Sequence, residues 1–292
     1  MTLAPIVLFV YNRPWHTQQT VEALKKNELA SESELFVYSD AAKNEEAKKS
    51  VDEVREYIKT IDGFKKLTII EREKNWGLAN SIIDGVTSII NEYGKIIVLE
   101  DDLVTSPNFL NYMNESLEKY KDEKKVYSVT GYSFSKDIEA IESTYFLQLT
   151  SSWSWATWKE KWEDFSYKNE VFDVCLQEKN KFNYDNSYNY SGMVKQQLLG
   201  KIDSWAIYWY ASVFLNQGLT LYPAKSLIEN IGFDGSGTHC DKSQSNEKSY
   251  NSRYLLTDDI EEKSVNRNHI ANYLKNQNKK RSWMNKIKSV FK

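Results

Sequence analysis

The segment 96–102, Ile-Ile-Val-Leu-Glu-Asp-Asp, constrains the fold of this 292-residue chain more than any other. Its apolar part, residues 96–99, is dominated by β-branched side chains and predicts a strand buried on both faces in the middle of a sheet. Three acids follow directly, and neighbouring carboxylates repel one another and resist burial. A divalent cation or a hydrogen-bonded polar ligand at the end of this strand would relieve both costs. A solvated acidic loop is the alternative interpretation.

Strands and helices are expected to alternate through the first half of the chain. Besides 96–99, apolar runs of strand length occur at 6–11, 35–38, 67–70 and 126–129. Helical periodicity or helix-start residues lie between them, at 14–26, 44–61, 78–91 and 106–121. The last helix is expected to open with Ser106 and Pro107 as cap and first-turn residue. This order predicts an α/β fold with a mostly parallel central sheet and helices on both faces.

The second half is less regular. Strands are expected at 145–149, 219–222 and 227–231, with loop and short helices over 165–200. A helix is expected from Asp203 to about residue 217, closed by Gly218.

Four tryptophans cluster between two of these strands. Trp158 and Trp162 are four residues apart, which predicts one helical face in the core. Trp153 and Trp155 lie among small polar residues, and one of them is a candidate for lining a ligand site.

Charge is unevenly distributed along the chain. Residues 263–292 hold nine Lys or Arg and no Asp or Glu, so residues 1–262 carry 29 basic against 41 acidic side chains. We therefore expect a globular domain over 1–262 and a basic tail over 263–292.

In the tail, apolar residues are expected on one helical face and lysines on the other: Trp283, Met284, Ile287, Val290 and Phe291 against Lys286, Lys288 and Lys292. A basic amphipathic helix suits an anionic membrane surface, and a disordered end is the alternative. No nucleic acid is expected as a partner, because the acidic body would oppose it.

The two cysteines, Cys175 and Cys240, are too few for a disulfide framework or a metal motif and fit a reducing compartment. No signal-peptide pattern occurs at the N-terminus, since the apolar run 6–11 is short and lacks preceding basic residues. No apolar stretch approaches the roughly 20 residues of a membrane-spanning helix. We expect a cytoplasmic protein with peripheral contact at the inner face of the cell membrane through residues 275–292.

Two common phosphate-binding signatures do not occur in the sequence, Gly-x-Gly-x-x-Gly after the first strand and the Walker-type Gly-x-x-x-x-Gly-Lys. If the sheet handles phosphates, it is therefore expected to do so through a metal ion and side chains.

Five features, in this order, resemble GT-A glycosyltransferases: a strand ending in Asn-Arg, a strand ending in Ser-Asp, the Glu-Asp-Asp run, a Trp-rich segment and an Asp-x-Trp helix start. The resemblance spans residues 5–239 and is greatest to the inverting N-acetylglucosaminyltransferase I type. Bacterial family-2-like transferases of capsule and lipopolysaccharide synthesis share its first half. It implies the GT-A fold, with 1–130 as the nucleotide-binding half and 131–262 as the acceptor and catalytic half. It also implies Mn²⁺ or Mg²⁺ as cofactor and a nucleotide-sugar donor, expected to be UDP-linked.

The resemblance implies roles for individual residues. Asp102 is expected to ligate the metal, and Glu100 and Asp101 to hold ribose and sugar hydroxyls. A hard cation there offsets the negative charge of a departing nucleoside diphosphate. Arg13 is implied as a nucleotide-phosphate or base contact and Asp40 as the uracil contact, with an ordinary surface pair as the alternative for both.

Asn80 is a further candidate for nucleotide contact, with helix capping and solvation as the alternative. Asp203 occupies the position of the family's general base, which takes the proton of the acceptor hydroxyl during in-line attack on the sugar C1. A helix N-cap is the alternative for Asp203. The relatives carry a second Asp where this chain has Ser204, and Gly-x-Gly-Trp where it has Ser-Trp-Ser-Trp, so the donor sugar stays open.

Three glycines in residues 232–239 predict a loop that closes over a donor. His239 is a candidate contact to the diphosphate or the metal, with a surface histidine as the alternative. His16 and His269 are interpreted as structural or exposed.

These observations predict an inverting, metal-dependent glycosyltransferase that extends a cell-surface glycan or a lipid-linked glycan. A sugar-nucleotide nucleotidyltransferase is a weaker interpretation, because the Gly-rich loop after its first strand is missing. A retaining transferase is also compatible with the sequence. Outside enzymes, the chain could serve as a non-catalytic glycan-binding or assembly scaffold protein.

Overall fold

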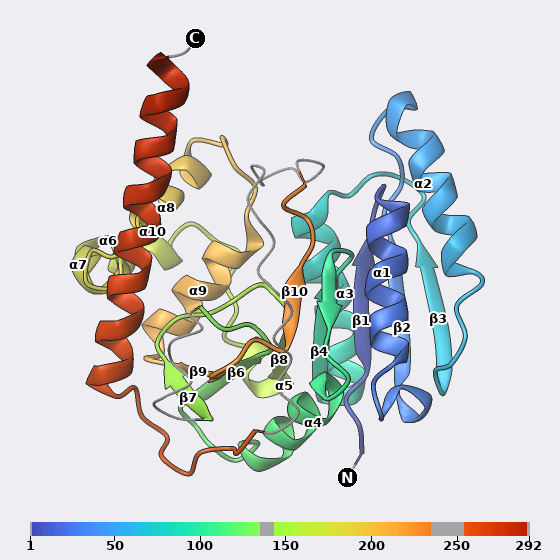
Figure 1. Ribbon diagram of the computed structural model, residues 1–292, viewed down its shortest axis with the longest axis horizontal. Helices are drawn as coiled ribbons and strands as arrows, with labels where there is room; N and C mark the ends of the chain where they lie inside the picture. Colours follow the sequence, from blue (N-terminus) through green and yellow to red (C-terminus); the bar gives the residue numbers. More distant parts are fainter. Residues whose placement is uncertain (1, 135–142, 235–253, 291–292) are drawn as a thin grey trace.

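The structure is a computed structural model that describes residues 2–134, 143–234 and 254–290, with side chains described up to residue 279 (Figure 1). Its large sheet is formed by β1 (Ile6–Val10), β2 (Glu34–Ser39), β3 (Lys66–Glu71), β4 (Lys95–Glu100), β6 (Val126–Thr130), β7 (Thr144–Leu147), β8 (Trp155–Trp158) and β9 (Leu219–Pro223). The strand order is β3-β2-β1-β4-β8-β6-β9-β7. Only β7 and β8 run against the others, so the sheet is mostly parallel. A small antiparallel sheet pairs β5 (Leu103–Thr105) with β10 (Ile228–Asn230).

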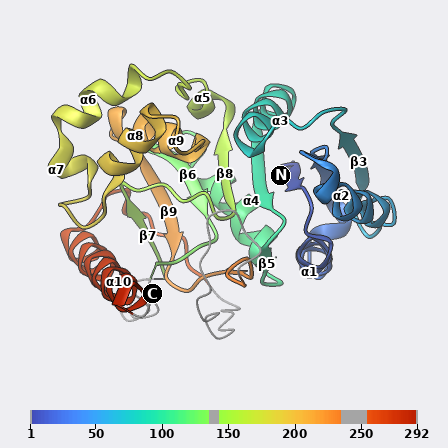
Figure 2. The same cartoon turned by 90° about the horizontal axis from the view of Figure 1, so that it is seen from above.

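Helices cover both faces of the large sheet. They are α1 (Pro14–Lys25), α2 (Glu45–Ile58), α3 (Leu78–Tyr93), α4 (Phe109–Lys119), α5 (Lys159–Trp162), α6 (Val171–Gln177), α7 (Lys179–Phe182), α8 (Tyr190–Leu198), α9 (Trp205–Leu215) and α10 (Ser264–Val290), with a short 3₁₀ helix at Ala30–Glu32. Figure 2 shows α3 and α9 on one face and α1 on the other. The predicted α/β class, mostly parallel with helices on both faces, is confirmed.

The buried strands explain why their sequences are continuously apolar. Successive side chains of a strand point to opposite faces. In β1, Ile6 and Leu8 pack in the core under α1, α2 and α4, whereas Val7 and Phe9 pack in the core under α3 and α9. Because both faces are covered, every position of β1 is buried.

The prediction misses β8, which lies between β4 and β6 and runs antiparallel to both. In it, Trp155 is in register with Val98 of β4 and Thr130 of β6. Trp158 and Trp162 therefore do not share a helical face, since Trp158 ends this strand and Trp162 lies in α5. Both are buried, as predicted.

The start of α4 also differs from the prediction. Residues 103–105 form β5, and α4 begins at Phe109 instead of at Ser106 and Pro107. A residue outside the helix caps it, because the side-chain oxygen of Asn27 accepts a hydrogen bond of 2.9 Å from the Leu110 N–H.

The first part of α10 packs against the second half of the chain. Ile270, Ala271 and Leu274 are buried there, and Arg267 pairs with Asp185 at 2.7 Å. The side chains predicted to form a basic amphipathic face, from Trp283 onward, lie outside the described ones. None of the helices in the described ranges combines the length and apolar character that a membrane crossing requires.

Candidate active site

The Glu-Asp-Asp turn joins β4 to β5 at the carboxyl edge of the sheet. Strand alternation places Glu100, the last residue of β4, on the face covered by α3 and α9, with Val98. Asp101 follows the strand, in the turn. Asp101 and Asp102 are buried, with only 4% and 8% of their surface exposed. Asp101 and Asp102 are therefore part of the protein interior and Glu100 is partly buried, so the interpretation as a solvated loop is wrong.

Arg13 reaches this turn from the loop between β1 and α1. Its guanidinium pairs with the Asp101 carboxylate and lies 3.0 Å from Oδ2 of Asp102. The Thr20 hydroxyl, two turns along α1, donates a 2.9 Å hydrogen bond to the Asp101 carbonyl oxygen. The structure thus brings Arg13 together with the acids, as expected for groups that follow neighbouring parallel strands.

One guanidinium faces three carboxyl groups. Burial, followed by the charges of Asp102 and Asp101, raises the pKa of Glu100 to about 8. Burial also raises the pKa of Asp101, although Arg13 opposes this shift. The site therefore has a deficit of positive charge.

This deficit predicts a pH-dependent stability. A carboxyl group whose pKa rises from 4.5 to about 8 on folding favours the folded state at low pH and loses this contribution as the pH rises through that range. Glutamine has no charge to bury, so we expect Glu100→Gln to remove this loss of stability at high pH. The free energy of unfolding of the variant should exceed that of the wild type by roughly 2 kcal/mol at pH 8, with no such gain at pH 4.5. Urea unfolding at several pH values without divalent cations measures this. The exposed Glu73→Gln is the control, and parallel pH profiles for wild type and Glu100→Gln would refute the expectation.

The turn also offers the donor set of a hard divalent cation. Mg²⁺ and Mn²⁺ prefer oxygen ligands, and Mg²⁺ is usually held by one or two carboxylates together with substrate phosphates. Among the described residues, no group of three or more His, Cys, Asp or Glu side chains is arranged to bind a metal ion by itself. The turn therefore supplies carboxylate oxygens of the kind that a hard cation prefers.

Residues 231–234, directly after β10, lie against the acids. The Ile231 N–H donates a 2.9 Å hydrogen bond to the Asp102 carbonyl oxygen. A Cβ atom at Gly232 would lie 2.2 Å from Asp102 Oδ2 and 3.0 Å from Arg13 Nη1. Gly232 does not have a left-handed backbone, so close approach to Asp102 is what requires glycine here.

We expect Gly232→Ala to displace the Asp102 carboxylate from Arg13. Overpacking of this kind lowers the free energy of unfolding by about 1–3 kcal/mol. In an Asp102→Ala background the 2.2 Å clash with Asp102 Oδ2 is absent, and the same substitution is expected to cost much less. Urea denaturation of the wild type, the two single variants and the double variant measures the coupling between residues 232 and 102. Equal costs in both backgrounds would contradict it.

Asp40 is also buried, and it already has four donors within the chain. Its Oδ1 accepts from the N–H groups of Ala41 and Trp76, and its Oδ2 from the Asn75 amide and the Gly77 N–H, all at 2.9–3.0 Å. Four donors fill the acceptor capacity of a carboxylate. In this structure Asp40 therefore fixes the loop that leads into α3, and its contact to uracil stays a prediction.

Asn80 lies in the first turn of α3. Its amide donates a 2.9 Å hydrogen bond to the Trp76 carbonyl oxygen, and its side chain is exposed. A nucleotide contact for Asn80 stays a prediction. His239 lies outside the described residues.

Asp203 precedes α9 at the same edge of the sheet as the acids. A short turn links α9 to β9, which runs parallel to β6, so α9 begins where these strands end. Trp205, the first residue of α9, stacks on Trp155 of β8 at 5.2 Å between ring centroids. The alternative that Asp203 caps α9 is wrong, because the N-cap is Ser204. Asp203 Oδ1 instead accepts a 2.8 Å hydrogen bond from the Tyr167 hydroxyl.

Tyr167 keeps its proton in this pair. Burial, together with the hydrogen bond to Asp203, raises the pKa of Tyr167 above its ordinary value. One carboxylate oxygen of Asp203 therefore accepts from a protonated hydroxyl.

The tryptophans at 153 and 155 differ in their surroundings. Trp155 is buried among Trp162, Trp205 and Trp209. Trp153 is only partly buried and packs against Phe233, next to Gly232, at 5.5 Å between ring centroids. Of the two candidates, Trp153 is the one near the acidic turn.

His16, which the sequence indicates only as structural or exposed, is a buried neighbour of the acids. It is 5% exposed, and its Nε2 lies 3.2 Å from Asp234 Oδ2. The spacing of Arg13, His16 and Thr20 along one face of α1 is a signal that could have found it.

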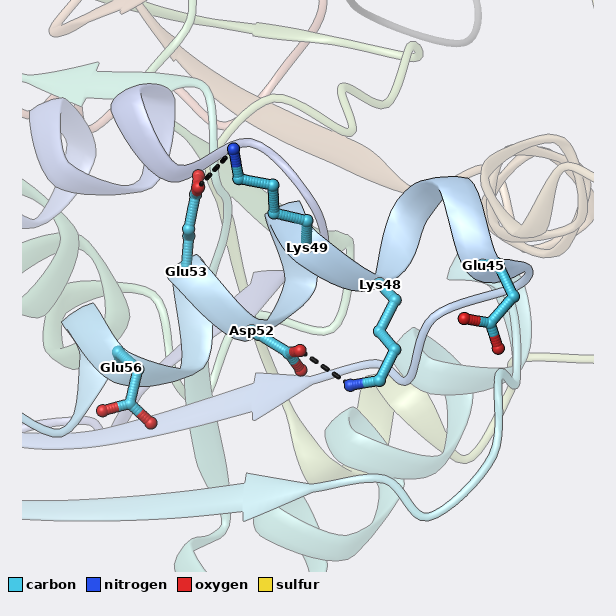
Figure 3. Close-up of a pocket in the computed structure, with 6 residues that line it drawn as sticks. All are labelled: Glu45, Lys48, Lys49, Asp52, Glu53 and Glu56. Carbon is cyan, nitrogen blue, oxygen red and sulfur yellow. Dashed lines mark hydrogen bonds and ion pairs between the residues drawn. The ribbon is translucent and has the colours of Figure 1, made fainter.

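A hollow of about 690 Å³ lies elsewhere, on the outer surface of α2 (Figure 3). Its walls are charged side chains, including the pairs Lys48–Asp52 at 2.7 Å and Lys49–Glu53 at 3.9 Å. Exposed pairs four residues apart on a helix contribute only a few tenths of a kcal/mol. This hollow is a solvated helix surface and not part of the site.

Comparison with known proteins gives a family and several solved structures. The sequence matches "Glycosyl transferase family 2" over residues 6–175, more than half of the chain. Among solved structures, TarS of S. aureus (residues 1–349) has a TM-score of 0.45 and 11% identity over 77% of this chain and 59% of that chain. The mannosyltransferase PcManGT of Pyrobaculum calidifontis, in complex with GDP-Man and Mn²⁺, has a TM-score of 0.42 and 10% identity over 73% and 70%. Mouse xyloside xylosyltransferase 1 has a TM-score of 0.41 and 9% identity over 72% and 81%.

The chain thus spans about three-fifths of the TarS fragment. No curated protein matches the sequence. The family match extends from β1 through the Glu-Asp-Asp turn to α6 and confirms the resemblance to GT-A glycosyltransferases. The chain accordingly belongs to glycosyl transferase family 2.

Proposed function

We propose that this protein is an inverting, metal-dependent transferase that moves a sugar from a UDP-linked donor to a cell-surface glycan or lipid-linked glycan. The observation that carries the proposal is the cluster of Arg13 and Glu100 with the buried Asp101 and Asp102 at the carboxyl edge of the sheet. Asp203 lies at the same edge. This edge is where open α/β sheets bind ligands.

In the proposed reaction the acceptor hydroxyl attacks C1 of the donor sugar from the side opposite the diphosphate. The bond from C1 to the diphosphate oxygen breaks, the new glycosidic bond forms, and the hydroxyl proton passes to Asp203. Tyr167 holds Oδ1 of Asp203, which leaves Oδ2 to take that proton. Inversion at C1 follows from this single in-line displacement.

The leaving diphosphate needs positive charge. Arg13 supplies one such charge beside Asp101 and Asp102. Asp102 would hold a Mn²⁺ or Mg²⁺ ion, which when bound offsets the negative charge of the departing nucleoside diphosphate. Glu100 and Asp101 are proposed to hold hydroxyls of the ribose and the sugar.

A screen of donors tests this function. The full chain is incubated with UDP-, GDP- and dTDP-sugars, with and without Mn²⁺, and release of the nucleoside diphosphate is measured. We expect metal-dependent hydrolysis of a UDP-sugar. The anomeric configuration of a transfer product, read by NMR, then distinguishes inversion from retention. Failure of every donor to react or bind would favour a non-catalytic scaffold.

Peripheral contact with an anionic membrane at the inner face of the cell membrane is proposed for the end of α10. In Figure 1 this end extends beyond the body on the side to which β1 and β4 point. Contact there would bring a lipid-linked acceptor towards the carboxyl edge of the sheet. Deletion of residues 280–292 leaves the docked Leu274 and Asn278 in place. If this variant sediments with anionic vesicles as the full chain does, the membrane contact is refuted.

A further inference from the structure

The first turn of α1, directly after Arg13, carries backbone donors that the helix itself leaves unpaired. The helix begins at Pro14, no side chain at Arg13 caps it, and its first turn holds no acidic residue. The N–H groups of Trp15 and His16 lie in this turn, where a helix offers them no carbonyl partner. Together with the helix dipole they favour an anion.

The His16 side chain is a second, independent observation. It is 95% buried, and its Nε2 has no hydrogen-bond partner among the described residues. The 3.2 Å contact to Asp234 Oδ2 has the distance of an ion pair but not the geometry of a hydrogen bond. A buried polar atom left without a partner is unfavourable, and an acceptor oxygen placed against Nε2 would remove this cost.

Asp234 places a carboxylate beside these donors. About half of its side chain is exposed, and it lies two residues after Gly232, whose backbone approaches Arg13. Arg13 and His16 therefore face one short segment that carries an anionic group. A phosphate has more acceptor oxygens and more negative charge than a carboxylate, so it suits a guanidinium, an imidazole and helix N–H groups together.

We propose that Arg13, His16 and the first turn of α1 form a phosphate-binding subsite, whose place the Asp234 carboxylate holds when no phosphate is bound. This rests on the proposed function, in which two molecules carry this chemistry, the donor diphosphate and the phosphate of a lipid-linked acceptor. His16 donates from Nε2–H to a phosphate oxygen, and Asp234 competes with the phosphate for the same donors.

Calorimetric titration of the full chain with inorganic pyrophosphate, without divalent cations, tests the subsite. We expect His16→Leu to weaken binding by about tenfold or more, the effect of losing a hydrogen bond to a charged group. We expect Asp234→Asn to strengthen it about three- to tenfold, because the competing charge is removed. His269→Leu, in α10, is the matched control and should bind as the wild type does. In the His16→Leu background, Asp234→Asn should have little effect.

Titration with UDP in the presence of Mn²⁺, and with uridine, separates the two sources of phosphate. If the donor occupies the subsite, His16→Leu weakens UDP binding by the same factor as pyrophosphate binding and leaves uridine binding unchanged. If the acceptor occupies it, only pyrophosphate binding weakens.

The subsite is overturned if both single variants bind pyrophosphate as the wild type does, or if Asp234→Asn weakens binding. Asp234→Asn changes a half-exposed side chain, so it remains informative even if His16→Leu does not fold. Pyrophosphate binding with the expected pattern, together with no binding of any nucleoside diphosphate, would retain the subsite and remove the proposed transferase function.

Discussion

Asp203→Asn is expected to lower kcat by about a thousandfold while the KM for the donor stays unchanged, because a general base contributes roughly 10²–10⁴ to the rate. An amide has nearly the shape of a carboxylate but cannot take the acceptor proton. The amide oxygen can still accept a hydrogen bond from the Tyr167 hydroxyl, so the start of α9 should keep its structure. Initial rates with varied donor and acceptor measure both constants.

The control for this experiment is Asp173→Asn, which changes an exposed acid in the first turn of α6. It should leave both constants as in the wild type. Hydrolysis of the donor by water, without acceptor, should fall less than transfer, since the proton on the acceptor is what Asp203 removes. If Asp203→Asn keeps more than about a tenth of the wild-type kcat, the role as base is wrong.

Asp102→Asn is expected to have an effect of similar size on metal-dependent turnover. Stabilising the charge of a leaving diphosphate is worth several kcal/mol, so loss of the carboxylate that would hold the cation should lower kcat/KM by about a thousandfold. Raising the Mn²⁺ concentration should restore part of the rate, because the remaining acids still attract the ion. Rates over a range of Mn²⁺ concentrations measure this.

The stability of Asp102→Asn shows whether a lower rate reflects loss of the ligand or loss of the fold. Asp102 contributes to the raised pKa of Glu100, so removing its charge relieves repulsion in the cluster. Asp102→Asn should therefore unfold in urea at no lower concentration than the wild type at pH 8. The exposed Asp122→Asn is the matched control. Unchanged metal dependence in Asp102→Asn would refute its role as the ligand.

The elements fixed by local sequence could be predicted. The apolar runs of β1 and β4 are continuous because both faces of the sheet are covered, and a run of that kind has few other interpretations. The Arg13 loop and the acidic turn follow from these two strands, since parallel neighbours end at the same edge.

Elements fixed by distant partners could not be predicted. β8 is short, and its strand conformation depends on pairing with Val98 and Thr130, which the sequence around Trp155 does not reveal. Asp203 does not cap α9, and its Oδ1 instead accepts a hydrogen bond from Tyr167, which is remote in sequence. The same limit applies to His16. Its spacing from Arg13 can be read in the sequence, but its contact with Asp234, more than 200 residues away, cannot.

Nucleotide binding by the acidic turn is the central claim, and calorimetric titration with UDP tests it most directly. The full chain is titrated with UDP, GDP and dTDP, each with Mn²⁺ and with a chelator, and Asp102→Asn is titrated in parallel. We predict UDP binding that requires Mn²⁺ and is strongly weakened in Asp102→Asn. Binding that is equally tight with the chelator, or no binding of any of the three with Mn²⁺, would contradict the claim.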